Sequence, residues 1–237
     1  MSIFAIGDVH LSLGSETDKP MSVFGAAWEN HDRRLAEDWR RQVTEQDTVI
    51  VAGDISWGLK LEDAMPDLEF LDALPGHKVM IKGNHDLWWN GITRLNRLFD
   101  DMTFLQNSCC EAEGWYICGS RGWLCPGSEG FTESDERIYL RETGRVERSL
   151  EAARSRGAER IIAVTHYPPT NDKLQPSDFT KMFTEAGVKT ALYGHLHGPE
   201  SYGKGLRGIL NGVRYQLVSL DFLECHLRRI TDGTTLL

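Results

Sequence analysis

The sequence predicts a layered α/β fold, and two observations support this prediction. Short apolar runs of the strand type alternate with helix-like segments through most of the 237 residues, a pattern typical of strands covered by helices rather than of a bundle or a sandwich of strands alone. The 41% hydrophobic content is enough for a sizeable core. Because the sequence contains no repeat, low-complexity tract or clear linker, we expect a single domain over residues 1–237.

The strands are expected at six apolar runs of four to six residues, a usual strand length. These runs cover residues 3–6, 48–52, 78–82, 115–119, 160–165 and 189–193.

Helices are expected between these strands. Asn30 and Ser177 are polar residues that can cap two of them, and the segment 133–156 is predicted to cover the sheet with one face despite Gly144. Apolar residues recur at helical spacing in the three segments: Leu35, Trp39 and Val43; Met182, Phe183 and Ala186; and Tyr139, Val146, Leu150 and Ala153, with Thr143 on the same face.

The pattern changes after His197. Residues 198–212 are predicted to form a glycine-rich loop, and residues 213–230 two antiparallel strands that end the domain. Earlier in the chain, the stretch SRGWLCPGSEGF follows a strand and is long enough for a lid or specificity loop over residues 120–132.

Charge and composition exclude several classes of function. The net charge of -9 argues against binding of long nucleic acid. The beginning MSIFAIGDVH lacks the features of a signal peptide, and no apolar run is long enough to span a bilayer, so we expect no membrane association. Five cysteines without a regular spacing indicate reduced thiols and a cytoplasmic protein. Cys118 and Cys125 could bind zinc, although their spacing is wider than usual.

Polar side chains of one chemical kind follow five of the predicted strands. The carboxyl ends of strands in open α/β sheets deliver loops to a common site, so these residues are expected to converge. They are Asp8 and His10; Asp54; Asn84, His85 and Asp86; His166; and His195 and His197.

Carboxylates, imidazoles and an amide oxygen together suit borderline divalent metals such as Mn, Fe, Zn, Co or Ni, whereas calcium prefers oxygen donors almost alone. The number of donors is sufficient for two ions. A dinuclear site with one shared carboxylate lowers the pKa of a water molecule and neutralises charge on a phosphoryl group. The pattern therefore predicts a site that produces a hydroxide near neutral pH and can hold the oxygens of a phosphoryl group.

The ordered motifs D-x-H, G-D, G-N-H-[DE], a lone His and G-H-x-H resemble those of the calcineurin-like metallophosphoesterase superfamily. All five occur here in order, from Asp8 to His197. The resemblance implies a four-layer α/β/β/α sandwich of two mixed sheets flanked by helices, with the metal site at the carboxyl ends of the strands. It also implies an enzyme with two divalent or mixed-valence metal ions, Mn, Fe or Zn.

The resemblance also implies a role for each motif residue. Asp8, His10, Asp54 and His197 would bind one ion, and Asp54 would bridge to a second ion that is also held by Asn84, His166 and His195. A hydroxide that bridges the two ions would be the nucleophile. His85 would contact the phosphate and protonate, or hydrogen-bond, the leaving oxygen. Asp86 could cap the following segment or orient a neighbouring histidine.

The sequence departs from some branches of the superfamily. Protein phosphatases typically read G-D-x-V-D-R-G at the second motif, but here GDISWG places Trp57 where the aspartate partner of the catalytic histidine would be. His85 disfavours the lipid A precursor hydrolases, which generally have arginine there. The intact GHLH motif favours the phosphodiesterase-like branch.

We therefore expect a phosphodiesterase that acts on a small or medium-sized phosphoester. The alternatives are a phosphomonoesterase or an atypical protein phosphatase, and, from another class, a metal-binding scaffold without catalysis. Arg121 could form bidentate hydrogen bonds with the phosphate, or its side chain could simply be solvated. Tryptophans 57, 88, 89 and 123 could form a wall beside the leaving group, or they could pack loops onto the sheet. The sequence does not predict the oligomeric state.

Overall fold

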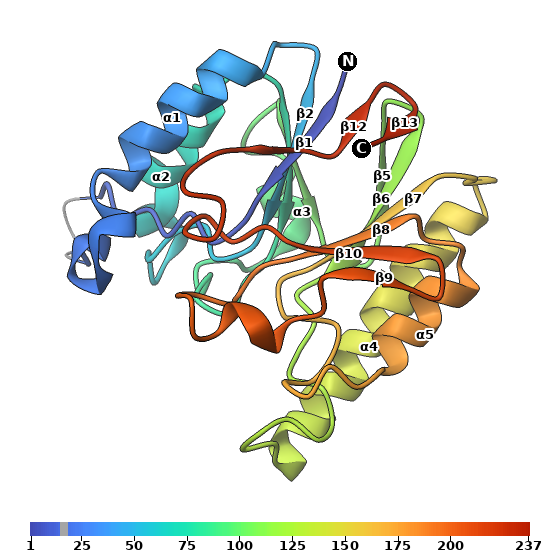
Figure 1. Cartoon of the computed structure of the whole chain (residues 1–237). Coiled ribbons are helices and arrows are strands. Elements are labelled where there is room, and N and C mark those ends of the chain that lie inside the picture. Colours follow the sequence, from blue (N-terminus) through green and yellow to red (C-terminus); the bar gives the residue numbers. More distant parts are fainter. Residues whose placement is uncertain (15–18) are drawn as a thin grey trace.

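The computed structural model describes residues 1–14 and 19–237. Two sheets lie between two groups of helices, which gives four layers (Figure 1). Helices α1 (His31–Gln42) and α2 (Leu61–Asp72) cover the first sheet, and α4 (Glu133–Arg154) and α5 (Asp178–Glu185) cover the second. The α/β class and the α/β/β/α sandwich are therefore confirmed.

The first sheet has the strand order β11-β1-β2-β3-β4. Its four strands β1 to β4 are parallel, and β11 pairs antiparallel with β1 at the edge. Their carboxyl ends therefore lie along one margin of the sheet. The strand bounds are β1 Ile3–Ile6, β2 Thr48–Ala52, β3 His77–Ile81, β4 Met102–Leu105 and β11 Arg228–Arg229.

The second sheet has the order β5-β6-β7-β8-β10-β9. Strands β6, β7, β8 and β10 are parallel, whereas β5 and β9 pair antiparallel at the two edges. The strand bounds are β5 Cys109–Ala112, β6 Trp115–Ser120, β7 Ile161–Thr165, β8 Thr190–Tyr193, β9 Gly208–Leu210 and β10 Val213–Leu217.

All six predicted strands are present, with bounds that differ by at most one residue at either end. The prediction for the C-terminal region was wrong in two respects. Strand β9 lies inside the expected loop 198–212, and the two strands expected to pair within 213–230 lie in different sheets. The reason is that β10 extends the parallel sheet beside β8, and the chain then crosses to β1, where β11 completes the first sheet.

The predicted helices are also present, but only one of the two caps forms. Ser177 Oγ accepts hydrogen bonds from the backbone of Phe179 and Thr180 at the start of α5. Asn30 precedes α1 in a left-handed conformation (φ 48°) and makes no capping bond. The remaining elements are η1 Met21–Phe24, η2 Ala26–Trp28, α3 Ile92–Leu95, η3 Tyr202–Lys204, β12 Thr231–Asp232 and β13 Thr235–Leu236.

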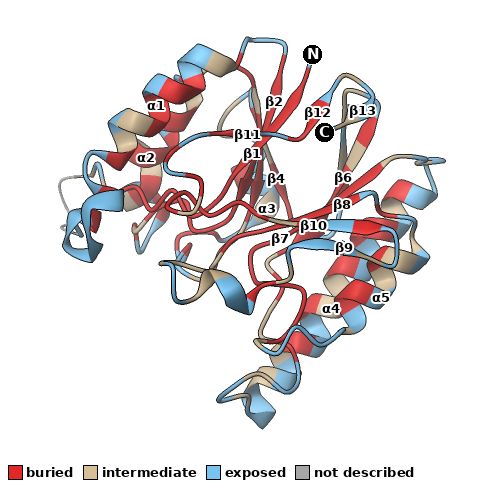
Figure 2. Ribbon diagram, viewed as in Figure 1, coloured by how far each residue is buried: buried red, intermediate tan, exposed pale blue. Residues whose placement is uncertain are grey.

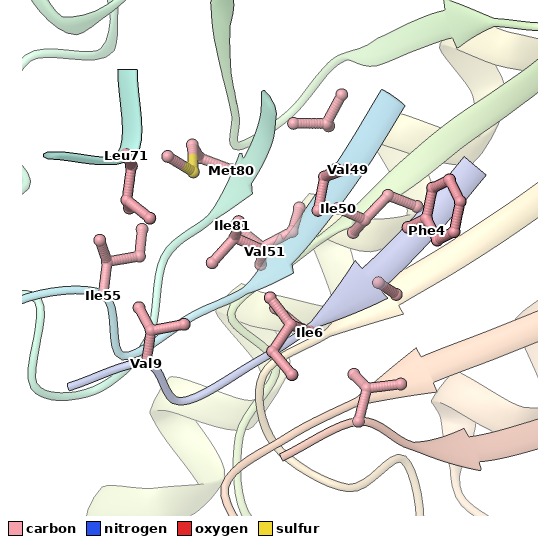
Figure 3. Packing of buried hydrophobic residues seen from close by; sticks show 14 of the residues in the cluster. Phe4, Ile6, Val9, Val49, Ile50, Val51, Ile55, Leu71, Met80 and Ile81 are labelled. Atoms are coloured by element: carbon pink, nitrogen blue, oxygen red, sulfur yellow. The ribbon is translucent and has the colours of Figure 1, made fainter. Parts of the chain in front are cut away.

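The parallel strands of the two sheets form the buried centre of the molecule, whereas the outer faces of the helices are exposed (Figure 2). The first core joins α1, α2 and the inner faces of both sheets, and Figure 3 shows part of it around Phe4, Ile50 and Met80. The second core lies between the second sheet and α4 and α5, where Tyr139 and Val146 of α4 are buried as the helical pattern predicted. Among the helices that the structure describes, none is long and apolar enough to cross a membrane.

Candidate metal centre

The loops that follow β1, β2, β3, β7 and β8 meet at one end of the two sheets. Backbone hydrogen bonds hold them together: the amide of Asp8 donates to the carbonyl of Gly53 at 2.8 Å, and that of Gly194 donates to His166 at 3.0 Å. Gly7 also donates to Val218 across the two sheets at 2.7 Å. These bonds position polar side chains from distant parts of the chain around one volume.

The first group of donors consists of Asp8, His10 and His197, which can each offer an atom within 4.8 Å of the others. His10 Nε2 lies 3.4 Å from His197 Nε2, and His197 Nε2 lies 3.5 Å from Asp8 Oδ1. Asp8 and His10 are buried and His197 is partly exposed, so the group opens toward solvent on one side.

The second group consists of Asp54, His166 and His195, again within 4.8 Å. His166 Nε2 lies 3.3 Å from Asp54 Oδ2 and 3.2 Å from His195 Nδ1. The side-chain oxygen of Asn84 lies 2.9 Å from the same nitrogen of His166, so Asn84 adjoins this group.

Asp54 lies between the two groups. Its Oδ2 is 3.3 Å from His166 Nε2 in the second group and 3.7 Å from His10 Nε2 in the first. Its Oδ1 accepts a hydrogen bond from the backbone amide of His85 at 2.8 Å. One carboxylate is therefore within reach of both groups, the position that a bridging ligand would occupy.

The backbone around the donors is held in an unusual conformation. Asp8, His10, Asp54 and His195 all have positive φ angles, between 45° and 70°. Such angles are rare outside glycine and concentrate at functional sites. A Cβ atom on Gly83 would overlap the carboxylate of Asp54. The missing side chain therefore leaves room for the carboxylate, and the donor set fits divalent cations such as Mn, Fe or Zn.

Burial and neighbouring charges separate the pKa values of the four histidines. Burial opposes protonation of His166 and His197, but Asp54 raises the pKa of His166 to about 9, and Asp221 with Asp8 raises that of His197 to about 10. Burial lowers the pKa of His10 to about 4 and that of His195 to about 3. Each group therefore pairs a protonated imidazole with a neutral one, and a cation between them would replace the proton.

Asp221 is a further residue of this centre that the sequence analysis missed. His197 Nδ1 donates to Asp221 Oδ1 at 3.0 Å, and Asp221 Oδ2 accepts from Gly198 N and Tyr202 Oη, both at 2.9 Å. The carboxylate thus fixes the ring orientation of His197. It follows an apolar strand, as the motif residues do, so the same strand-end signal was present in the sequence.

His85 lies outside both groups and is exposed. Its ring centroid is 4.4 Å from that of Trp57, whose ring also stacks on His10 at 4.8 Å. Burial of the ring lowers the pKa of His85, although the charge of Asp54 opposes this effect. His85 therefore contacts an indole ring, and its lowered pKa favours the neutral imidazole at neutral pH.

Asp86 connects the second and third motifs and is completely buried. Its Oδ1 accepts from the backbone amides of Ile55 at 2.8 Å and Ser56 at 3.2 Å, and its Oδ2 accepts from Gly83 at 2.7 Å. Burial and the charge of Asp54 raise its pKa to about 6. The carboxylate holds together the two loops that carry Asp54, Asn84 and His85.

Three other sets of residues lie outside the donor groups. Arg121 donates to the buried carboxylate of Glu142 at 3.2 Å and stacks on Trp123, so its predicted phosphate contact stays a prediction. Trp88 and Trp89 pack in the core beside Phe104. Within residues 1–14 and 19–237, no candidate metal group includes a cysteine.

Two cavities border the centre. The larger, of about 810 Å³, is lined by His10, His85 and His197 together with Trp28 and Trp57. The smaller, of about 290 Å³, is lined by His195, and two of its polar groups, Thr170 Oγ1 and Asp172 Oδ1, have no hydrogen-bond partner among the described residues. The donor groups are thus accessible from two sides.

Comparisons with known proteins agree with this geometry. The family model of the calcineurin-like phosphoesterases matches residues 1–199. The Gene 66 protein of Mycobacterium phage D29 is 40% identical over 195 residues, which are 81% of this chain and 76% of that protein. The Gene 66 protein of Mycobacterium phage L5 is 41% identical over 58 residues, which are 24% of this chain and 28% of that protein.

Two solved structures have the same fold. TT1561 of Thermus thermophilus superposes with a TM-score of 0.62 at 12% identity and covers 96% of both chains. Phosphopantetheinyl Hydrolase (PptH) from Mycobacterium tuberculosis superposes with a TM-score of 0.53 at 16% identity, over 98% of this chain and 96% of that one.

Proposed function

The chain belongs to the calcineurin-like phosphoesterase family and is a metal-dependent phosphoester hydrolase, and from this premise we propose that it is a dinuclear phosphodiesterase. The observation that carries the dinuclear assignment is the position of Asp54 between two groups of donors. We assign Asp8, His10 and His197 to one ion, and Asn84, His166 and His195 to the other, with Asp54 shared. All seven donors are present, which argues against a scaffold that has lost its metals.

Two divalent ions held there would polarise the phosphoryl oxygens and lower the pKa of a water molecule. The chain's own residues perform the remaining tasks. Asp54 and Asp8 provide fixed negative charge, Asp221 orients His197, and Asp86 holds the turn that presents His85. The ions are proposed to be Mn, Fe or Zn, because this set of carboxylate, imidazole and amide donors can bind all three.

The hydrolysis itself requires one proton transfer. The oxygen of a water molecule forms a new bond to phosphorus as the ester P–O bond breaks, and the departing oxygen gains a proton. His85 is exposed beside the donors and is the group we assign to hydrogen-bond that departing oxygen. Water supplies the proton when the imidazole is neutral.

The preference for a diester rests on the two cavities. A phosphodiester carries two organic groups and a monoester only one. The cavity at His85 and the cavity at His195 offer a separate place for each group. The loop 120–132 contributes Leu124, Cys125, Ser128 and Glu129 to the smaller cavity, which supports its role as a specificity loop.

We further propose that residues 1–237 act as one domain in a reducing compartment such as the cytoplasm. Strand β11 completes the sheet that β1 begins, so the two ends of the chain belong to one unit. All five cysteines are free, which supports the reducing compartment.

The test compares bis-p-nitrophenyl phosphate with p-nitrophenyl phosphate, using chelator-treated protein before and after addition of Mn²⁺. We expect cleavage to return with the metal and to favour the diester. Preference for the monoester would instead make the protein a phosphomonoesterase. Cleavage of neither ester by protein that holds two metal ions would contradict the assignment to small phosphoesters.

A further inference from the structure

The larger cavity is lined by three motif histidines, His10, His85 and His197, and by parts of the chain outside the five motifs. These parts are the η1–η2 segment, Trp57 in the loop after β2, and the chain around η3 and after β10. The large apolar and aromatic side chains of its lining are Met21, Phe24, Trp28, Trp57, Tyr202 and Phe222.

Aromatic rings dominate these walls. Trp28 is buried and its ring centroid lies 5.3 Å from that of His197. Tyr202 and Phe222, which also line the cavity, pack edge to face at 5.0 Å. Phe24 is 69% exposed although it lines the cavity, so it lies at the mouth. Ligand sites of this size typically have such apolar walls with a few polar groups.

The charges of the cavity oppose an anionic ligand outside the phosphate itself. Among the described residues, its lining contains no lysine or arginine, and its acidic residues are Asp221 and Glu224. Asp221 is already hydrogen-bonded to His197, Gly198 and Tyr202. Lys19 stacks on Trp57 at 4.5 Å but does not line the cavity. Arg207 stacks on the ring of Phe222 at 5.3 Å and likewise does not line the cavity, so a second phosphate or a carboxylate would meet no lysine or arginine on the described cavity wall itself.

We propose that this cavity holds the leaving group of the substrate, and that the leaving group is a bulky, uncharged alcohol with an apolar or aromatic body. The inference rests on the proposed function, because His85 lines the cavity and is assigned to the departing oxygen. It excludes nucleoside polyphosphates and phosphorylated acidic peptides as substrates whose leaving group enters this cavity.

The experiment uses phosphonates, whose P–C bond is not hydrolysed, so that the organic group varies without any reaction. Their dissociation constants from Mn²⁺-loaded protein are measured by calorimetry for methylphosphonate, 2-naphthylmethylphosphonate, benzylphosphonate and 4-carboxybenzylphosphonate. We expect the naphthyl compound to bind at least about tenfold more tightly than the methyl compound, because apolar surface is buried. The carboxylate should weaken binding relative to the benzyl compound. Equal affinities across the series would overturn the proposal.

A matched pair of variants tests whether the naphthyl ring of the ligand lies in the larger cavity. Phe24→Ala removes a side chain at the mouth, whereas Val23→Ala changes the neighbouring residue, which is 72% exposed and does not line the cavity. Phe24→Ala should weaken binding of the naphthyl compound about three- to tenfold and binding of the methyl compound less than about twofold. Val23→Ala should leave the dissociation constants of both compounds unchanged. Equal weakening by both variants, or by neither, would place the ring elsewhere and contradict the proposal.

The two proposals fail in different ways. If the protein cleaves bis-p-nitrophenyl phosphate but the phosphonates bind equally well, the cavity proposal falls and the enzymatic function stands. If the naphthyl preference depends on Phe24 but no phosphoester is cleaved, the leaving-group assignment falls with the function.

Discussion

At the scale of single residues, His85 differs from the other four motif histidines because it belongs to neither donor group of the described chain. It is exposed, it lines the larger cavity, and its main-chain amide donates to Asp54. A side chain in this position can reach a substrate without competing for a metal. The geometry therefore separates its role from that of Asn84, its neighbour in the chain.

For His85→Ala we expect the bound metal to stay close to the wild-type amount and the rate to fall by about two to four decades, because a hydrogen-bond donor to the leaving oxygen is lost. Elemental analysis and steady-state kinetics measure the two quantities. His85→Gln keeps an N–H donor and should recover part of the rate. Metal-free His85→Ala protein would show that the imidazole is a ligand instead.

Asp221 acts on the centre through His197. For Asp221→Asn we expect about a 10- to 100-fold loss of metal affinity, since the carboxylate that orients the ring and accepts its Nδ1 proton is replaced. Competition with a fluorescent chelator measures this affinity. Tyr202→Phe removes only the hydroxyl contact to Asp221 and should have a smaller effect. Unchanged affinity in Asp221→Asn would mean that the loop alone orients His197.

At the scale of elements, the carboxylate of Asp86 joins the loop after β2 to the loop after β3. Asp86→Asn places an amide N–H opposite the amide of Gly83 or those of Ile55 and Ser56, so at least one hydrogen bond is lost. We expect the variant to lose about 1–3 kcal/mol of unfolding free energy. Its rate should fall by about one to two decades, because the turn that carries His85 shifts. Urea denaturation and kinetics test this.

Asp67 provides the matched control for Asp86. It is equally buried, and its carboxylate accepts from the amide of Leu13 at 2.7 Å and from the hydroxyl of Ser56. An amide can still accept the first bond and donate the second, and burial raises the pKa of Asp67 in any case. Asp67→Asn should therefore keep wild-type stability and rate at pH 7. If both variants behaved alike, the loop connection through Asp86 would be incidental.

The strands could be predicted because their residues are apolar on both faces of parallel sheets, so each appears as a continuous run such as TVIVA. The donor residues could be predicted because each follows such a run. The pairing of β10 and β11 could not, since both sheets offer an open edge and nothing local in residues 213–230 selects between them. The failed cap at Asn30 has a similar reason, because the chain enters α1 from η2 in a left-handed turn.

The larger cavity illustrates a different limit. Phe24 and Trp28 lie about 200 residues before Phe222 in the sequence, and none of the three belongs to a motif, so only the folded chain brings them together beside the donors. Arg121 is the opposite case. Its position after β6 suggested a phosphate contact, but the buried Glu142 of α4, which the helical pattern did not single out, binds its guanidinium.

At the scale of the whole molecule, the donors come from both sheets. Asp8, Asp54 and Asn84 follow strands of the first sheet, and His166, His195 and His197 follow strands of the second. Cations held between them would connect the two halves, so metal binding and folding stability are linked. Removal of the metal by a chelator should therefore lower the stability of the entire fold, although the metal site lies at only one end of the sheets.

The stabilisation by metal depends on pH, because a cation competes with protons at His166 and His197. The direction of this dependence follows from the raised pKa values of His166, about 9, and His197, about 10. In the metal-free protein, their protons contribute stability that is complete below the ordinary histidine pKa near 6.5 and is lost as the pH rises toward 9–10. A bound cation must displace the same protons, so its affinity increases over this range. The difference in stability between metal-loaded and metal-free protein should widen from pH 6.5 to pH 9.

The measurement is the melting temperature with Mn²⁺ or with a chelator at several pH values. A metal concentration about a hundredfold above its dissociation constant adds roughly 2.7 kcal/mol, which corresponds to an increase of roughly 5–11 °C for a chain of this size. Asp54→Asn should lose most of the increase, because it weakens the ligand shared by both groups, whereas Asp67→Asn should keep it. If the melting temperature were the same with and without Mn²⁺ at every pH, the donors of the two sheets would not bind ions together. That result would contradict the dinuclear proposal.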